Sequence, residues 1–167
     1  FVFLHGSAID GADPLTFAAF PESMFDYARD AKRVYFRARP IPDADPEPFT
    51  ALTAEDPGGY WNDRSAVYRA GRRIEHAEAA SFERLSPFYA RDAERVYFGG
   101  TWMPDVDRAS FEVLKAGVYA RDRSGLYFLE RRAFEGADPA SFEVIEDSAC
   151  ARDAHHARAA RARERRL

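Results

Sequence analysis

Residues 89–98 read YARDAERVYF, and three other stretches of the chain align with them without gaps. These are YARDAKRVYF at residues 27–36, YWNDRSAVYR at residues 60–69 and YARDRSGLYF at residues 119–128. The leading tyrosines lie 33, 29 and 30 residues apart, and a second tyrosine follows each of them by 8 positions. Such a period is typical of tandem-repeat proteins, whose units are too small to bury their own apolar side chains and therefore stack on their neighbours.

The repeat continues beyond this stretch. A phenylalanine follows the second tyrosine by 14 or 15 positions, at Phe49, Phe82, Phe111 and Phe142. An acidic residue follows it by 10 or 11 positions, at Asp45, Glu78, Asp107 and Asp138. We therefore divide residues 1–150 into a partial repeat at 1–24 and four repeats at 25–58, 59–87, 88–117 and 118–149. Residues 150–167 form a decayed repeat, in which Cys150 replaces the leading tyrosine, and a basic tail.

Each aligned stretch is expected to form a β-hairpin. Val96 and Phe98 alternate with Tyr97, which is the period of a strand, and Val, Tyr and Phe favour strands. The turn between the two strands begins with an aspartate, which accepts a hydrogen bond from the backbone two residues on. We expect these aspartates to lie on solvated turns and to be structural: Asp30, Asp63, Asp92 and Asp122.

The second half of each repeat is expected to hold a third apolar stretch, an acidic turn, one helical turn and a short strand. The apolar stretches are centred on Ile9, Ile41, Ile74, Met103 and Phe134. The acidic turn reads GADP, DADP, DVDR or, in one repeat, HAEA, and an aspartate before proline suits a helix N-cap. Phe111 with Val113 is typical of a strand, whereas Phe82 with Leu85 is typical of a helical turn, so both readings stay open. The predicted fold is mainly β, built of tandem repeats of about 30 residues, with an Ala/Arg-rich C-terminus that is helical or disordered.

Composition and charge limit the class of protein. The chain of 167 residues is 46% hydrophobic and 14% aromatic and contains no apolar run long enough for a membrane-spanning helix. Its single cysteine excludes an intramolecular disulfide. Residues 151–167 hold 6 arginines and 2 acidic residues, whereas the rest of the chain holds 18 basic and 26 acidic residues. We expect the tail to be solvated and the acidic repeats not to bind nucleic acid.

The repeats resemble those of the DKNYY family, whose typical motif reads close to YAKDKNHVYY and is followed by a stretch similar to GADP-x-TFE. The matching residues here are YARDAERVYF with DVDRASFEVL and YARDRSGLYF with GADPASFEVI, and the resemblance covers residues 1–150. It implies a bacterial protein built of repeats and brings no catalytic residues with it. This copy departs from the name motif at the hairpin turns, where Asp-Ala-Glu or Asp-Arg-Ser stands in place of Asp-Lys-Asn. Because the sequence starts within a repeat, without Met, we expect the native N-terminus to lie further upstream, and the compartment, cytoplasmic or exported, stays open.

Few residues are candidates for chemistry. Paired carboxylates in the acidic turns could bind a hard cation such as calcium: Asp43 with Asp45, and Asp105 with Asp107. The second carboxylate is missing from the other repeats, so helix capping is the favoured interpretation and no metal or other cofactor is expected. The four histidines stand at non-equivalent positions without metal-ligand spacing, and no catalytic motif is present. We therefore expect no catalytic residues.

Trp61 and Trp102 are the chief aromatic residues outside the repeat pattern and are the candidate binding residues. If Tyr60 faces inward, strand alternation turns Trp61 toward solvent. Exposed tryptophans are common contact residues for proteins and also suit sugars, whereas buried ones would fill gaps between repeats. The predicted function is a non-catalytic scaffold or protein-interaction module. The alternatives are a protein that binds carbohydrate or cell wall through exposed aromatic residues and, as a third option, an enzyme.

Overall fold

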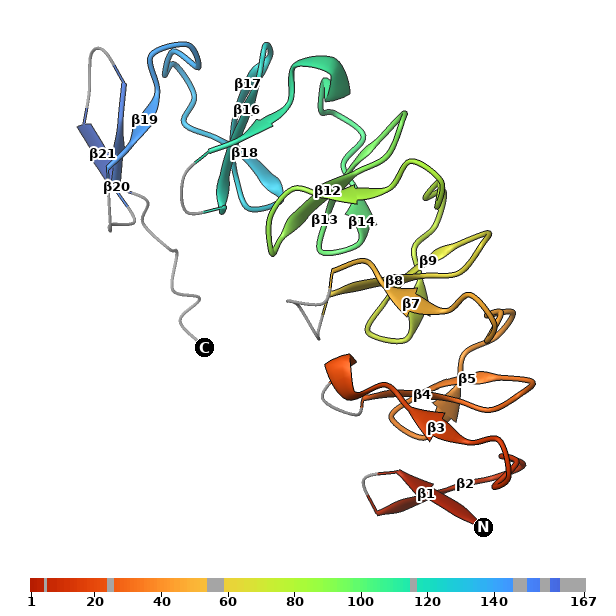
Figure 1. Ribbon diagram of the computed structural model, residues 1–167. Helices are drawn as coiled ribbons and strands as arrows, with labels where there is room; N and C mark the ends of the chain where they lie inside the picture. Colours follow the sequence, from red (N-terminus) through yellow and green to blue (C-terminus); the bar gives the residue numbers. More distant parts are fainter. Residues whose placement is uncertain are drawn as a thin grey trace. The chain divides into compact units, whose positions relative to one another are not determined.

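The computed structural model describes residues 1–4, 6–23, 26–53, 59–114, 117–145, 150–153 and 157–159. Residues 157–159 are described by their backbone alone. The chain forms a series of small antiparallel sheets with two single 3-10 turns, as Figure 1 shows. The prediction of a mainly β protein built of repeats is therefore confirmed.

Four sheets of four strands share one order, in which consecutive strands of the chain are neighbours. Their strands are β3 (Ala18–Ala19), β4 (Tyr27–Arg29), β5 (Val34–Phe36) and β6 (Arg39–Pro40); β7 (Thr50–Ala51), β8 (Tyr60–Asn62), β9 (Val67–Arg69) and β10 (Arg72–Arg73); β11 (Glu83–Arg84), β12 (Tyr89–Arg91), β13 (Val96–Phe98) and β14 (Thr101–Trp102); β15 (Glu112–Val113), β16 (Tyr119–Asp122), β17 (Gly125–Phe128) and β18 (Arg131–Ala133). The first sheet has β1 (Val2–Leu4) and β2 (Ser7–Ile9), and the last has β19 (Glu143–Val144), β20 (Cys150–Arg152) and β21 (Ala157–Ala159). The 3-10 turns are η1 (Pro21–Ser23) and η2 (Arg108–Ser110).

The two central strands of each full sheet are the predicted hairpin. In the third full sheet Tyr89 lies opposite Phe98 and Ala90 lies opposite Tyr97. The segment after the acidic turn, for which a strand or a helical turn was open, forms a strand in each repeat, after η2 in the case of β15. This strand pairs with the hairpin of the following sequence repeat, as β11 does with β12, so each sheet spans the boundary between two sequence repeats.

The decayed repeat keeps its hairpin, because β20 pairs with β21. Ala157–Ala159 are therefore a strand rather than part of a helix. Pairing with a neighbouring strand here overrides the helix propensity of the Ala/Arg composition. The rest of the tail, residues 160–167, lies outside the described residues.

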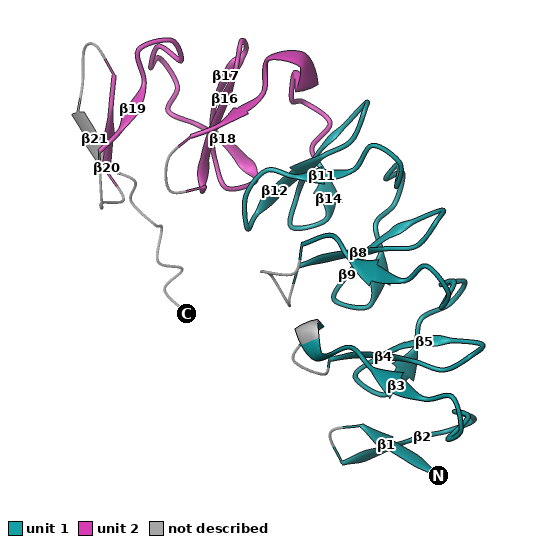
Figure 2. Ribbon diagram, viewed as in Figure 1, with its two compact units in different colours: residues 1–102 teal, residues 103–167 magenta. Residues whose placement is uncertain are grey.

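The chain divides into two compact units, an N-terminal unit of Phe1–Trp102 and a C-terminal unit of Met103–Leu167, which are coloured separately in Figure 2. Within the N-terminal unit the hairpins are buried on both faces. Tyr27 and Val34 of one hairpin pack in one cluster with Trp61 and Tyr68 of the next. Ala28 and Tyr35, on the opposite face of the first hairpin, pack against the sheet before it.

The same alternation recurs one repeat later, where Tyr60 and Val67 pack with Ala90 and Tyr97. Ile74 and Phe82 complete that cluster, so the third apolar stretch and the repeated phenylalanine also face the core. Each fully buried aromatic or large aliphatic side chain contributes roughly 1.5–3 kcal/mol. The side chains at the repeated apolar positions are therefore buried in the contacts between neighbouring sheets.

Gly71 marks the closest approach of two neighbouring sheets. Its backbone N–H donates to the Tyr27 hydroxyl at 2.8 Å, and its φ of 72° lies in the left-handed region. A Cβ atom on Gly71 would lie 2.6 Å from the side chain of Phe36, which is too close for any real pair of carbon atoms. A glycine is therefore required here both by backbone conformation and by space.

Substitution of Gly71 tests this packing. Gly71→Ala is expected to lower the free energy of unfolding by about 2–4 kcal/mol, because left-handed strain of about 1–2 kcal/mol adds to overpacking against Phe36. In a Phe36→Ala background the same change is expected to cost only the strain, about 1–2 kcal/mol. Denaturant unfolding of the four proteins measures both costs. Equal costs in the two backgrounds would contradict the close approach of the sheets.

Candidate functional site

The aspartates that begin the hairpin turns are buried, which corrects the expectation that they are solvated. Asp92 has no exposed surface. Its Oδ1 accepts the backbone N–H groups of Glu94 at 2.9 Å and Arg95 at 2.7 Å, which closes the turn as predicted. Its Oδ2 accepts the hydroxyl of Tyr97 at 2.6 Å and the backbone N–H of Glu78 at 3.1 Å. The carboxylate is buried because these last two donors, from the second strand and from the preceding acidic turn, cover it.

The same network occurs in all four full repeats. The second tyrosine donates its hydroxyl to the aspartate over 2.6–2.9 Å, and the acidic turn donates a backbone N–H over 2.7–3.1 Å. The aspartates are Asp30, Asp63, Asp92 and Asp122. The tyrosine partners are Tyr35, Tyr68, Tyr97 and Tyr127. The acidic-turn donors are Asp13, Asp45, Glu78 and Asp107.

The network sets the protonation of its members. Desolvation acts to raise the pKa of Asp30, but hydrogen bonds from Tyr35 and from three backbone N–H groups outweigh it and lower the pKa to about 2. The pKa of each of the other three aspartates is lowered for the same reason. Burial first, and then the adjacent carboxylate, raise the pKa of the partner hydroxyls of Tyr35, Tyr68 and Tyr97.

These shifts have a consequence for stability and one for chemistry. Because the folded pKa of Asp30 lies below the ordinary value of 3.8, its ionisation stabilises the fold above about pH 4 and the contribution is lost as the pH falls toward 2. A carboxylate with a lowered pKa and both oxygens occupied is a weak proton acceptor. The geometry therefore suits these groups to holding the turn, the second strand and the acidic turn together.

In the acidic turns, two of the four candidate metal ligands accept hydrogen bonds from backbone N–H groups of their own turn. Asp107 Oδ1 accepts the N–H of Ala109 at 3.0 Å as the N-cap of η2, and its other oxygen pairs with Arg123. Asp45 accepts the N–H of Glu47 at 3.0 Å in the equivalent turn. Asp43 and Asp105 are exposed. Among the described residues no group of three or more histidine, cysteine or acidic side chains could hold a metal ion.

The two tryptophans occupy opposite environments. Trp61 is fully buried and stacks on Tyr27 and Phe49, with ring centroids 4.6 and 5.4 Å apart. Of the two alternatives left open for Trp61, filling a gap between repeats is therefore correct and exposure to solvent is not. Strand alternation does turn it away from the side of Tyr60, but that second face of the hairpin is covered by the preceding sheet. Trp61 stands where the other hairpins have alanine, and it fills the space between two sheets.

Trp102 is 45% exposed on β14, the last strand of its sheet. The guanidinium of Arg95 lies 5.7 Å from the centre of its ring, and the ring of His76 approaches it edge-on at 6.4 Å. Of the two candidate binding residues, only Trp102 is placed where a partner can reach it.

A basic pocket lies beside β14 and was not found from the sequence. It has a volume of about 520 Å³ and is lined by Arg69, Arg72 and Arg73 from β9 and β10, together with Gly99, Gly100 and Thr101 before Trp102. The sequence carried a signal for it, because Arg69 occupies the position of Phe36, Phe98 and Phe128 in the other repeats. We call the pocket and Trp102 together the basic edge.

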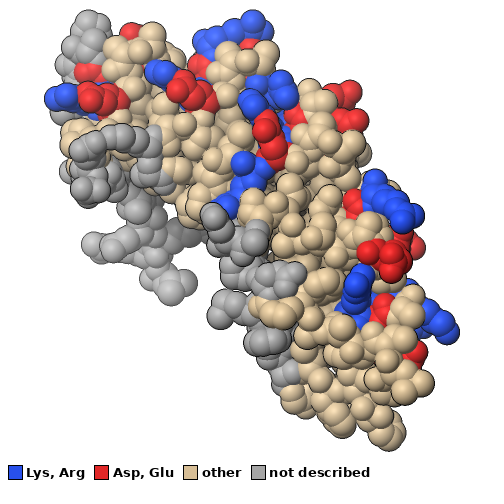
Figure 3. Space-filling model, in the orientation of Figure 1, with Lys and Arg blue, Asp and Glu red and all other residues tan. Residues whose placement is uncertain are grey.

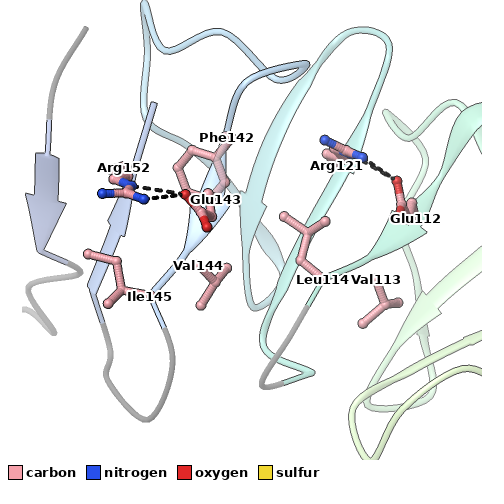
Figure 4. A pocket seen from close by; sticks show the side chains of 9 residues that line it. All are labelled: Glu112, Val113, Leu114, Arg121, Phe142, Glu143, Val144, Ile145 and Arg152. Carbon is pink, nitrogen blue, oxygen red and sulfur yellow. Dashed lines mark hydrogen bonds and ion pairs between the residues drawn. The ribbon is translucent and has the colours of Figure 1, made fainter. Parts of the chain in front are cut away.

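A second concave surface lies in the C-terminal unit between β15 and β19, and Figure 4 shows the side chains that line it. This groove has a volume of about 580 Å³ and combines aliphatic side chains with two ion pairs. Arg121 pairs with Glu112 at 2.7 Å and Arg152 pairs with Glu143 at 2.8 Å, each across two neighbouring strands. Its charged groups are therefore already neutralised by one another, unlike the arginines of the basic edge.

The surface as a whole shows mixed charge. Figure 3 shows basic and acidic side chains lying next to one another on the visible face, among a larger area without charge. No helix in the described part of the chain is long and apolar enough to cross a membrane.

A comparison with protein families matches residues 1–131 to the DKNYY family. The chain belongs to the DKNYY family. In this DKNYY protein the aspartate and both tyrosines of the repeat are the residues that build the buried network and the core, whereas the turn positions that depart from the family motif, Ala93 and Glu94, are exposed. Neither the curated proteins nor the solved structures compared with the chain gave a significant match.

The buried network predicts a large effect of removing one charge. Asp92→Asn is expected to lower the free energy of unfolding by about 2–4 kcal/mol, because the amide group that replaces Oδ2 cannot accept the hydrogen bonds of Tyr97 and Glu78. Asp43→Asn is the matched control, since Asp43 is exposed with a φ of 59° that asparagine tolerates, and its effect should stay within about 0.5 kcal/mol. Denaturant unfolding measures both variants. Equal effects would contradict the network.

Proposed function

We propose that this DKNYY protein is a non-catalytic repeat scaffold that binds a protein partner through the basic edge. The observation that carries the proposal is that the repeated positions are buried whereas variable positions are exposed. The repeated tyrosines, aspartates and phenylalanines are buried in contacts within and between sheets. Exposed residues that differ between repeats lie on the last strands of the sheets.

These last strands carry unlike side chains on equivalent frames. β6 presents Arg39 and Pro40, and β14 presents Thr101 and Trp102. β10 and β18 both present two arginines, Arg72 with Arg73 and Arg131 with Arg132. All eight residues are exposed. A rigid frame with interchangeable surface residues is how repeat proteins acquire binding surfaces without altering their core.

The absence of a catalytic role is part of the proposal. An enzyme needs polar groups gathered in a cleft. The environment there gives at least one of these groups a pKa suited to proton transfer. The buried carboxylates of this chain have equivalent environments and a lowered pKa. This equivalence supports a structural role for the carboxylates.

A protein partner is favoured over a carbohydrate. Sugar recognition by repeats calls for a row of exposed aromatic side chains along one face. Among the described residues beyond the first repeat, the exposed aromatic side chains are Phe88 and Trp102, and Phe88 stacks on Phe98 rather than standing in a row with Trp102. One tryptophan beside several arginines is instead the composition of a protein-binding hot spot.

Site-specific cross-linking tests the proposed function. A photoreactive phenylalanine analogue at position 102 is expected to cross-link to a defined protein in the cells that produce this chain, as identified by mass spectrometry. The control is the same analogue at position 93, which is exposed in the turn between β12 and β13, away from the basic edge. A cross-linked product at position 102 that is absent from position 93 is the expected result. No product at position 102, or the same products at both, would overturn the proposal.

A further inference from the structure

Two of the three arginines that line the pocket, Arg69 of β9 and Arg72 of β10, are cross-strand partners with like charge, whereas Arg73 lies opposite Tyr68. Like charges in this arrangement destabilise a sheet. No carboxylate in the described part of the chain forms an ion pair with Arg72 or Arg73. Arg72 and Arg73 therefore contribute positive charge to the pocket without an ion-paired carboxylate among the described residues.

Arg69 is held in place by neutral groups. Its guanidinium lies 5.0 Å from the ring centre of Tyr60, and its nitrogens donate to the Tyr60 hydroxyl at 3.3 Å and to the Pro87 carbonyl at 3.4 Å. Burial raises the pKa of Tyr60, so the phenol stays neutral at neutral pH. These contacts orient the guanidinium and leave its positive charge in the pocket.

The mouth of the pocket is kept open by two glycines. Gly99 and Gly100 form the turn between β13 and β14, with φ of 59° and 88°. A Cβ atom on Gly99 would lie 3.7 Å from Nη1 of Arg69, so a side chain at this turn would extend over the guanidinium. The equivalent turns contain Arg37 with Ala38, Ala70 with Gly71, and Leu129 with Glu130, so only this turn has two glycines. The turn beside Arg69 thus leaves access to it.

We propose that this pocket binds the carboxylates of an acidic segment of the partner protein. The inference rests on the proposed function and names the chemistry of the partner. Guanidinium groups bind carboxylates through paired hydrogen bonds. β10 and β14 are the last strands of their sheets, so an extended segment can lie along them and place its acidic side chains against the arginines and an apolar one against Trp102. The acidic surplus of residues 1–150 disfavours a long polyanion such as nucleic acid, whereas a short acidic segment meets the local positive charge.

Direct titration of the whole chain with a hexaglutamate peptide tests this inference. We expect binding, followed by calorimetry and by the emission of Trp102, that weakens at least tenfold in Arg72→Glu/Arg73→Glu. Arg39→Glu is the matched control, because Arg39 is the exposed residue at the equivalent position of β6 outside the pocket, and it should change binding less than twofold. Hexaglutamine should not bind, and a rise in salt concentration should weaken the binding of hexaglutamate. If the double charge reversal lowers the melting temperature, Arg72→Gln/Arg73→Gln provides the same test with a smaller change.

Three outcomes would overturn the inference. The first is no binding of hexaglutamate at millimolar concentration. The second is equal weakening by Arg39→Glu, which would show an attraction to overall charge instead of to the pocket. The third is binding of inorganic phosphate at the pocket without binding of hexaglutamate, which would show that the ligand of the pocket is an anion other than a carboxylate. Each outcome leaves the cross-link at position 102 unaffected, so failure of the inference is distinguishable from failure of the proposed function.

Discussion

The carboxylate buried in each hairpin turn is the interaction on which the architecture depends. Oδ1 of Asp92 fixes the turn between β12 and β13, and Oδ2 joins that hairpin to the acidic turn through Glu78. A buried charge is tolerated only when it is fully hydrogen-bonded, and here two backbone donors and a tyrosine hydroxyl lie within 3 Å of it, with a third backbone donor at 3.1 Å. The network explains why the aspartate and the second tyrosine recur together at a fixed distance of 5 residues.

The stacking of short sheets determines where function can reside. Because the hairpin of β4 and β5 is covered on both faces, Tyr27 and Ala28 are both buried although they point in opposite directions. The surface left for recognition consists of strand edges and turns. The basic edge differs from the rest of this surface, since Arg69 and Arg72 lie opposite each other, whereas in the groove of the C-terminal unit Glu112 and Arg121 form an ion pair.

The local structure could be predicted from the sequence, but the environment of single residues could not. Alternation and turn chemistry were sufficient for the hairpin of Tyr89 to Phe98, because strand period and an Asp-led turn are local properties. They could not show that Asp92 is buried, because one of its donors, Glu78, lies 14 residues away and is placed by tertiary packing. The burial of Trp61 stayed open for a related reason: alternation gave its direction correctly, but only the packing of the sheets shows that both directions lead into the core. The basic pocket was missed although Arg69, at a position otherwise held by phenylalanine, was visible in the repeat alignment.

The most direct test of this account is the pH titration of the aspartate carboxyl carbons by NMR in the whole chain. The account predicts that Asp30, Asp63, Asp92 and Asp122 all titrate below the ordinary pKa of 3.8, with Asp30 at about 2, because every one of these carboxylates accepts hydrogen bonds in its charged form. A titration of these four groups at or above the ordinary value would mean that desolvation outweighs the hydrogen bonds, and it would contradict the claim that the buried carboxylates hold the repeats together.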